Sequence, residues 1–348
     1  MSFTIKLAMI VRNEERALTS AAPYVDEMVV IDTGSQDATV EIAGSHAARI
    51  EHFPWCDDFS AARNHALAVA RADWVFMLDA DEWLVEGGRE LEHLRARRPR
   101  DLGVAQVAST FAIGDRTETQ VSRIVRVLPR GARFEGRIHE QPVFSTARFN
   151  LALVIAHDGY EPEQRQAKAG RNERLLRLAL SDAHDDPYLR YQLGRDLETQ
   201  GRFAEAVGEY VVALSADPRD AWRHDLDARA IYSMKMTGRF QEGLELAEDA
   251  LERWPSSPDI PFALGDLLLD VANTEPSSAG QLLPLIEGAW VRCLEIGDGS
   301  GLPGAVAGRG GHLAAANLAA FHEALGNPDE AARYRTLADK LQSSVSQS

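Results

Sequence analysis

The sequence predicts two domains of different fold class: an α/β domain with a mostly parallel sheet, followed by an all-α domain of helical repeats. Three observations support this prediction. Short apolar runs alternate with helical patterns in the first half, helical patterns alone fill the second half, and the second half repeats itself. A polar stretch after Tyr160 separates the two patterns, so we place one domain at residues 1–165 and the other at residues 166–348.

The first half begins with apolar runs that fit buried strands, each followed by a helical pattern. We expect strands at residues 4–11, 27–31, 48–53 and 74–78. We expect helices at residues 14–21, from Asp37 onward, at residues 59–70 and at residues 88–97. Strand–helix–strand repetition at this spacing produces right-handed crossovers, and hence parallel strands.

The pattern then changes, because the next strands follow one another with turns between them in place of helices. The clearest of these strands lie at residues 104–111, 120–128 and 151–157. Strands joined by short turns pair in antiparallel fashion. We therefore expect the parallel sheet to be extended by an antiparallel part.

An internal repeat runs through the second half. Its first copy, residues 188–218, has small or aromatic residues where two helices would touch, and two later copies match it less closely. These positions are Gly194, Gly201, Ala206 and Tyr210 in the first copy, Gly238, Ala247 and Ala250 in the second, and Gly326 and Ala331 in the third.

These copies resemble the tetratricopeptide repeat, a helix–turn–helix unit, over most of residues 187–340. The alternative is an ordinary helical bundle. In either case the helix pairs must stack to bury their apolar faces, and the stack leaves a concave surface.

Composition and charge exclude several classes of protein. The chain has 348 residues, of which 45% are hydrophobic and 26% are charged, as is typical of a folded protein. A net charge of −16 argues against a general binder of nucleic acids or anionic membranes, because both need a basic surface. No run reaches the roughly 20 apolar residues of a membrane span, and the first residues lack the layout of a signal peptide.

The two cysteines, Cys56 and Cys293, fall in different expected domains. A disulfide framework is therefore not expected, and a reducing cytoplasm fits best. The spacing of cysteines and histidines matches no zinc site.

Carboxylates follow the strand expected at residues 74–78. They are Asp79, Asp81 and Glu82. Ligands of an open parallel sheet lie beyond the carboxyl ends of its strands, which is where these side chains would be. If the extended course continues through them, Asp79 and Asp81 point to the same face. Two hard oxygen ligands there suit Mg²⁺ or Mn²⁺, which could bridge them to a diphosphate.

Polar segments also follow the first and second strands. Residues 9–15 end the first strand and residues 31–37 end the second, so both lie at the same edge of the sheet as Asp79. Gly34 permits a tight turn, and Asp32 can accept hydrogen bonds from a base or a ribose. The alternative for each segment is a helix-capping turn with solvated charged side chains.

Together these segments resemble the family 2 glycosyltransferases of the GT-A fold, a Rossmann-like α/β fold. The resemblance covers about residues 4–160, and its specificity comes from the order of four motifs. The motifs are MIVRNEE, DTGSQDAT, WCDDFSAARN and DADEW. The match is closest to a bacterial branch that includes sublancin-type peptide S-glycosyltransferases and whose members often carry helical repeats downstream.

The resemblance implies roles for residues around the nucleotide and the metal. Asp32 would contact the uracil or ribose of a nucleoside diphosphate sugar, with Val11 and Glu14 lining the same pocket. Asp79 would hold the ribose or a metal-bound water, and Asp81 would bind Mn²⁺ or Mg²⁺ directly.

The same resemblance assigns two residues of the third motif. Arg63 and Asn64 would face the nucleotide or its phosphates. A guanidinium suits phosphate oxygens on general grounds as well. The alternative for Arg63 is a salt bridge to Asp57 or Asp58.

The acceptor side is implied at residues 135–140. An inverting transferase needs a base that takes the proton of the acceptor, and Glu140 is the first choice and His139 the second. Gln141 follows Glu140 where the wider family commonly has an aspartate, so both candidates stay open. His157, at the end of a strand, would be a further metal ligand or else a histidine that is simply hydrogen-bonded.

The resulting hypothesis is a metal-dependent inverting glycosyltransferase with a UDP-sugar donor, although guanosine and thymidine donors stay open. Its acceptor would be a peptide or protein side chain docked on the repeats. One alternative is transfer to a saccharide or small metabolite, with the repeats serving to form a homodimer. Another is a scaffold that binds sugar nucleotides without turnover. None of these functions requires a nucleic acid or a membrane span.

Overall fold

The computed structural model describes residues 2–13, 20–46, 48–113, 116–144, 147–157, 162–298 and 301–345. The chain divides into two compact units, Met1–Asp182 and Ala183–Ser348. Helix α4 (Pro162–Asp182) contains the boundary expected at residue 165 and belongs to the first unit. The division therefore lies at the end of this helix.

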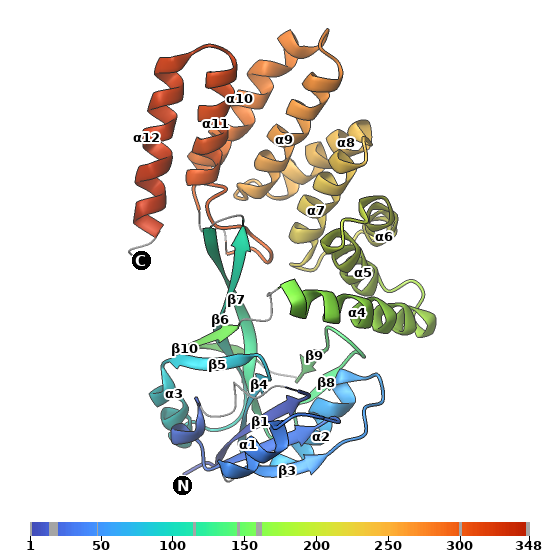
Figure 1. Ribbon diagram of the computed structural model, residues 1–348, viewed down its shortest axis with the longest axis vertical. Helices are drawn as coiled ribbons and strands as arrows, with labels where there is room; N and C mark the ends of the chain where they lie inside the picture. The colour runs from blue at the N-terminus through green and yellow to red at the C-terminus, as the bar shows by residue number, and fades with distance from the viewer. Residues whose placement is uncertain are drawn as a thin grey trace. The chain divides into compact units, whose positions relative to one another are not determined.

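An eight-stranded sheet forms the centre of the first unit (Figure 1), with the strand order β3-β2-β1-β4-β7-β6-β10-β5. Its strands are β1 (Ile5–Val11), β2 (Glu27–Asp32), β3 (Arg49–His52), β4 (Trp74–Asp79), β5 (Glu82–Glu86), β6 (Leu102–Ile113), β7 (Arg116–Pro129) and β10 (Arg148–His157). The first four strands in sequence run parallel, and β7 is antiparallel to both of its neighbours, β4 and β6. This arrangement confirms the predicted α/β fold with a parallel sheet and an antiparallel extension.

Three short strands add to those that the sequence predicts. Strand β5 follows β4 after a turn, and β8 (Arg133–Glu135) pairs with β9 (Gln141–Val143) in a separate two-stranded sheet. The helix predicted at residues 14–21 cannot be compared, since residues 14–19 lie outside the described part of the chain.

Helices α1 (Thr39–Ser45), α2 (Phe59–Ala70) and α3 (Gly88–His93) flank the sheet. Its central strands are apolar on both faces because helices cover both. On β1, Leu7 and Met9 belong to one buried cluster, whereas Ala8 belongs to the other, together with Ala66 of α2. Helix α2 begins where the carboxylate of Asp58 accepts the Ala61 N–H at 3.0 Å.

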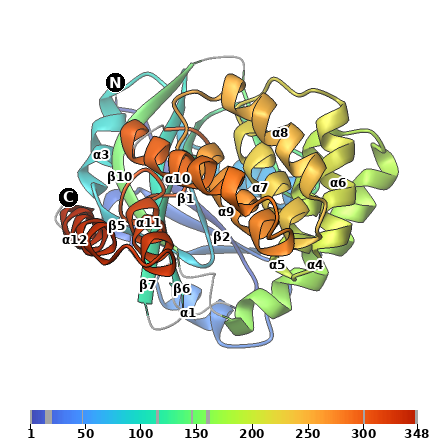
Figure 2. The same ribbon diagram turned by 90° about the horizontal axis from the view of Figure 1, so that it is seen from above.

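The second unit is entirely helical in its described part, as the sequence predicts, and Figures 1 and 2 show its helices following one another along a curved row. They are α5 (Pro187–Thr199), α6 (Phe203–Ser215), α7 (Arg223–Met236), α8 (Phe240–Arg253), α9 (Asp259–Thr274), α10 (Ala279–Ile296), α11 (His312–Ala324) and α12 (Pro328–Val345). None of the helices in the described ranges has the length and apolarity needed to traverse a bilayer.

Small residues allow the helices of a pair to approach closely. A Cβ atom at Gly194 of α5 would lie 2.3 Å from the ring of Tyr210 on α6, and one at Gly265 of α9 would lie 2.6 Å from Trp290 on α10. Both aromatic side chains are almost fully buried. Gly194 and Tyr210, two of the repeat positions picked out in the sequence, are therefore contact positions between paired helices.

Candidate functional site

The carboxyl ends of the parallel strands bring the predicted site residues to one edge of the sheet. Val11 at the end of β1 is in register with Asp32 at the end of β2. On the other side of β1, Ile10 is in register with Asp79 at the end of β4. Three separate segments of the sequence thus meet at this edge, as the topology of a parallel sheet requires.

Asp79 is clamped between two buried arginines. Arg63 of α2 donates to one carboxylate oxygen at 2.6 Å, and Arg126 of β7 donates to the other at 2.9 Å. Burial alone would raise the pKa of Asp79, but the two guanidinium charges outweigh it and lower that pKa. Asp79 is therefore a carboxylate whose charge the protein itself neutralises.

The chain turns directly after Asp79, which corrects the expectation of a continuous extended course. Strand β4 ends at Asp79, Ala80 and Asp81 form a turn, and β5 begins at Glu82. Glu82 closes the turn, because its carboxylate accepts the N–H of Asp79 at 3.1 Å. Asp79 and Asp81 consequently have different partners.

Asp81 lies against His157, the last residue of β10. Its carboxylate oxygen is 3.3 Å from Nε2 of the histidine. The other ring nitrogen, Nδ1, lies 3.1 Å from the hydroxyl of Ser109 on β6. Such a hydrogen bond to one nitrogen orients the ring and leaves the other nitrogen directed at the carboxylate.

The Asp81–His157 pair fits two of the ligands of a divalent cation. Octahedral Mg²⁺ binds at about 2.1 Å, so neighbouring ligand atoms lie about 3 Å apart. The observed separation of 3.3 Å between the two donor atoms is close to this value. Within the described ranges, no three His, Cys, Asp or Glu side chains converge on one point. The remaining positions would thus fall to water and to ligand oxygens, which is the usual pattern for Mg²⁺.

Glu140 and His139 lie in the short segment before β9. The side chain of Glu140 is 9% exposed, and its carboxylate forms an ion pair with Nε of Arg63, the guanidinium that also holds Asp79. His139 has a left-handed backbone with φ of 52°. The amide of Gln141 donates to the carbonyl of His139 at 3.1 Å. Arg63 therefore connects the predicted acceptor side to the predicted donor side.

Asp32 is held in place by its own turn. Its carboxylate accepts the N–H of Ser35 at 2.9 Å and that of Gly34 at 3.3 Å, and the ring of His52 lies 3.0 Å away. Burial raises the pKa of Asp32, but the hydrogen bonds from Ser35 and His52 lower it overall. Gly34 has a φ of 111°, which explains the glycine at this turn.

Other predicted residues have structural contacts of their own. The side chain of Val11 is buried in the core, and its carbonyl accepts the N–H of Thr33 at 3.0 Å. The amide of Asn64 donates to the carbonyl of Phe134 on β8 at 2.9 Å and accepts that residue's N–H at 2.8 Å. Asn64 thus fixes β8 against α2. Glu14 lies outside the described residues.

Neither nearby aspartate pairs with Arg63. Asp57 forms a two-pronged ion pair with Arg174 of α4, at 2.6 and 2.7 Å, and Asp58 caps α2. The partners of Arg63 are instead carboxylates remote in sequence, Asp79 and Glu140.

Three further residues contribute to this edge without a role that the sequence predicts: Ser109, Arg126 and Glu82. Arg126 interrupts the apolar end of β7, between Val125 and Val127. A charged residue within such a run is a signal for a buried partner of opposite charge. Ser109 carries no comparable signal, because serine is common on strands of this kind.

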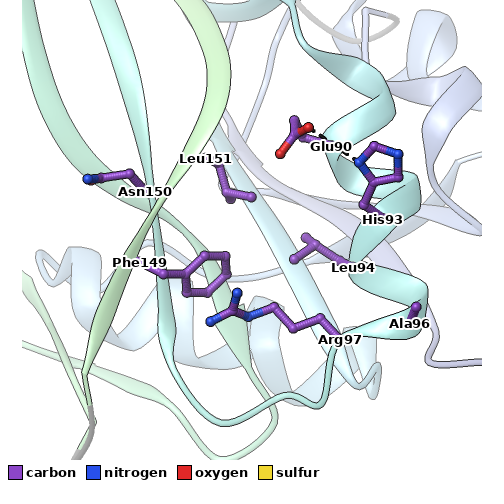
Figure 3. Close-up of a pocket in the computed structure, with 8 residues that line it drawn as sticks. All are labelled: Glu90, His93, Leu94, Ala96, Arg97, Phe149, Asn150 and Leu151. Atoms are coloured by element: carbon purple, nitrogen blue, oxygen red, sulfur yellow. Dashed lines mark hydrogen bonds and ion pairs between the residues drawn. The ribbon is translucent and has the colours of Figure 1, made fainter.

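A separate cavity of about 340 Å³ lies toward the amino end of β10 (Figure 3). Arg97 lies over the ring of Phe149 at 3.7 Å, and Glu90 is 3.3 Å from His93. None of the predicted site residues lines this cavity, and His157 is at the opposite end of the same strand. The cavity is therefore distinct from the edge that carries Asp79.

Comparison with known proteins finds a family profile that the first unit matches. Residues 8–152 match the sequence profile described as Glycosyl transferase family 2. A TPR repeat-containing protein of Synechococcus elongatus is 33% identical over a match of length 265 that covers 70% of this chain and 64% of that protein. The SPbeta prophage-derived glycosyltransferase SunS of Bacillus subtilis is 27% identical over a match of length 288 that covers 78% of this chain and 68% of that protein.

This chain thus spans about two thirds of the length of these relatives. Among solved structures, MamA from Desulfovibrio magneticus matches 52% of this chain and 91% of its own, with 17% identity and a TM-score of 0.40.

Proposed function

We propose, since residues 8–152 match the profile of glycosyl transferase family 2, that this chain is a glycosyltransferase that moves a sugar from a nucleoside diphosphate to an acceptor nucleophile. The observation that carries the proposal is the Asp81–His157 pair next to the arginine-clamped Asp79. It combines two side chains that could ligate a divalent cation with a carboxylate that is fixed in place, at the edge of the sheet where ligands of this fold bind.

On the donor side, Asp32 would accept a hydrogen bond from the uracil or the ribose of UDP. Its carboxylate is already fixed by backbone N–H groups, so binding would not require it to be ordered. Val11 would contribute its backbone position, because its side chain lies in the core. Glu14 follows Val11 in the motif MIVRNEE, and the resemblance alone supports its proposed place in the lining of the nucleotide pocket. Asp79 would accept from the ribose or from a metal-bound water.

For the diphosphate we propose Mn²⁺ or Mg²⁺ held by Asp81 and His157. A cation bound there would neutralise the charge that develops on the leaving diphosphate. Asp79 would contact the cation only through a bound water, because both of its oxygens already accept hydrogen bonds from arginines. Arg63 and Asn64 would then support the site through their partners, Asp79 and the main chain of β8.

We propose a single displacement with inversion at the anomeric carbon. A base takes the proton of the acceptor O–H or S–H, the acceptor atom bonds to the anomeric carbon, and the bond to the diphosphate oxygen breaks with its electrons leaving on that oxygen. Glu140 is the first candidate for the base and His139 the second. Glu140 already has Arg63 as a partner, so replacing each residue in turn is needed to separate them.

The acceptor is proposed to be a peptide or protein side chain. The similarity to the glycosyltransferase SunS and the stacked helix pairs of the second unit support this choice. A saccharide or small-metabolite acceptor, with the repeats forming a homodimer, remains the alternative, as does a sugar-nucleotide-binding scaffold without turnover. The free thiols of Cys56 and Cys293 are compatible with a reducing compartment.

The first test is the melting temperature of the protein with UDP, GDP and dTDP, each with and without Mn²⁺. A ligand present at about 100 times its dissociation constant stabilises the native state by about 2.7 kcal/mol. We expect one nucleotide to raise the melting temperature only with Mn²⁺. Asp81→Asn should abolish that metal-dependent rise, whereas the control Asp101→Asn, remote from the site, should retain it. No rise with any nucleotide would overturn the proposal.

A further inference from the structure

Arg126 and Glu82, two buried charged residues near Asp79, have no role in the proposed reaction. The side chains of Arg126 and Glu82 are both more than nine-tenths buried. A buried charge is costly unless it is paired, and a pair of this kind is weak evidence for stability alone. Their positions therefore call for a specific explanation.

Arg126 joins two carboxylates that come from consecutive strands. Its Nη2 donates to Asp79 at the end of β4 at 2.9 Å, and it forms an ion pair with Glu82 at the start of β5. One guanidinium thus contacts the last residue of β4 and the first residue of β5, and so links the two ends of the turn between them.

Glu82 closes the same turn through a hydrogen bond to its main chain. One of its carboxylate oxygens is held by Arg126, and the other accepts the N–H of Asp79 at 3.1 Å. Glu82 is also in register with His157, since β5 and β10 pair in antiparallel fashion. A single side chain thus ties the turn to β7 at the point where the turn faces β10.

Asp81 is the residue that this turn presents to His157. Of the two atoms that would ligate a cation, one belongs to this turn and the other to β10, so their separation depends on the shape of the turn. Loss of Arg126 would leave Asp79 and Glu82 as close carboxylates with only Arg63 to offset them. Their repulsion would open the turn and shift Asp81 relative to His157.

We infer that Arg126, acting through Glu82, is a positioning residue that sets the distance between Asp81 and His157 for metal-dependent binding of the nucleoside diphosphate. The inference rests on the proposed function. Arg126 touches neither donor nor acceptor in this assignment, and its effect is carried by the turn.

The test compares Arg126→Met with the conservative Arg126→Lys, and uses Arg123→Met as a matched control on the exposed face of the same strand. The dissociation constant of UDP is measured by calorimetry with and without Mn²⁺. Supporting groups of this kind commonly change metal affinity by about 10- to 100-fold. We expect Arg126→Met to weaken UDP binding at least about tenfold with Mn²⁺, and to leave metal-free UDP binding unchanged.

Arg126→Lys keeps the charge and should restore a large part of the affinity, while Arg123→Met should match the parent protein. A second readout needs no metal. The amide of Asp79, which donates to Glu82, should exchange its hydrogen faster in Arg126→Met. If Arg126→Met only lowers the melting temperature and leaves the Mn²⁺-dependent affinity unchanged, the residue supports the fold alone and the inference is overturned.

Should Arg126→Met fail to fold, Arg126→Lys and Glu82→Gln decide the question. Glu82→Gln retains an acceptor for the Asp79 N–H but loses the charge that pairs with Arg126. Glu82→Gln should show the weakened Mn²⁺-dependent affinity in full and Arg126→Lys only a small part of it, and parent-like affinity in both would overturn the inference. If UDP binding to the parent protein itself does not depend on Mn²⁺, the proposed function has failed, and that outcome is distinct from a failure confined to Arg126.

Discussion

Arg63 forms an ion pair with Glu140, a residue 77 positions further along the chain. The same guanidinium holds Asp79 at 2.6 Å, so one buried side chain on α2 contacts a carboxylate of the parallel sheet and one of the segment before β9. The donor and acceptor sides of the proposed reaction are therefore joined through a single residue. A displacement of Asp79 or Glu140 that moves Arg63 would also move the other carboxylate.

Replacing Arg63 should be far more damaging than replacing a surface arginine. Arg63→Met removes the ion-pair partner of the largely buried Glu140 side chain. It also removes one of the two guanidinium groups that contact the carboxylate of Asp79. Breaking a buried pair from one side commonly costs about 3–5 kcal/mol. Urea denaturation should show a loss of this order in the free energy of unfolding.

The matched control for this prediction is Arg49→Met. Arg49 pairs with Glu51 on the protein surface, where both side chains are substantially exposed. An exposed pair contributes at most about 1 kcal/mol. Equal losses in the two variants would show that the Arg63 network has no special energetic role.

The fold could largely be predicted because its elements have strong local signals. The apolar run of β4 marks a strand buried on both faces, and Asp58 before a helical pattern marks the start of α2. The turn at Ala80 and Asp81 has no such signal, since neither glycine nor proline occurs in it. Because Asp81 lies in this turn, the alternation of strand side chains does not apply to it.

The sequence predicts which residues lie at the site, but it predicts less well which of them form hydrogen bonds and ion pairs with one another. Motifs give the residue types at the ends of the strands, and the parallel topology brings those ends together. Pairings across the sheet depend on strand order, which one sequence does not reveal. For Arg63 the neighbours in sequence, Asp57 and Asp58, are natural partners on local grounds, whereas the folded chain supplies Asp79 and Glu140.

The ion pair between Asp57 and Arg174 should be visible in an acid titration. Hydrogen bonds from Arg174, and then from Trp55, lower the pKa of Asp57 from 3.8 to about 2. A lowered pKa in the folded state means that the interaction is fully present above about pH 4 and is lost as the pH falls through 2.

The indole N–H of Trp55 donates to Asp57 at 2.8 Å, so its NMR resonance reports the protonation of that carboxylate. Between pH 7 and pH 3 the resonance should stay constant in the parent protein. In Arg174→Met it should shift with a midpoint near the ordinary value of 3.8. Trp55→Phe identifies the resonance, and identical titrations with and without Arg174 would contradict the assignment.

The two thiols should react at very different rates. Cys56 is exposed, whereas Cys293 is buried and its thiol donates to the carbonyls of Ala289 and Pro258 at 3.3 and 3.4 Å. Burial raises the pKa of Cys293 to about 12, so almost no thiolate exists at pH 8. A disulfide reagent should therefore modify one thiol in the native protein and both in denaturant. In Cys56→Ser the native reaction should disappear, and rapid native labelling of Cys293 would instead reveal frequent opening of α10.

Two glycines on neighbouring helices should respond in opposite directions to the same substitution. At Gly194 the added Cβ would lie 2.3 Å from the buried ring of Tyr210, whereas at Gly208 of α6 no atom lies within 4 Å of it. Overpacking a filled contact costs about 1–3 kcal/mol. Alanine at an open position in a helix is favoured over glycine by about 1 kcal/mol.

Thermal or urea denaturation should therefore show that Gly194→Ala destabilises the second unit and that Gly208→Ala stabilises it. Helix propensity acts alike on both variants, so the difference between them isolates the contact between α5 and α6. A gain in both variants would mean that Tyr210 moves aside at little cost. In that case Gly194 would not mark a close helix–helix contact, and the physical basis for identifying the repeat from its small residues would be lost.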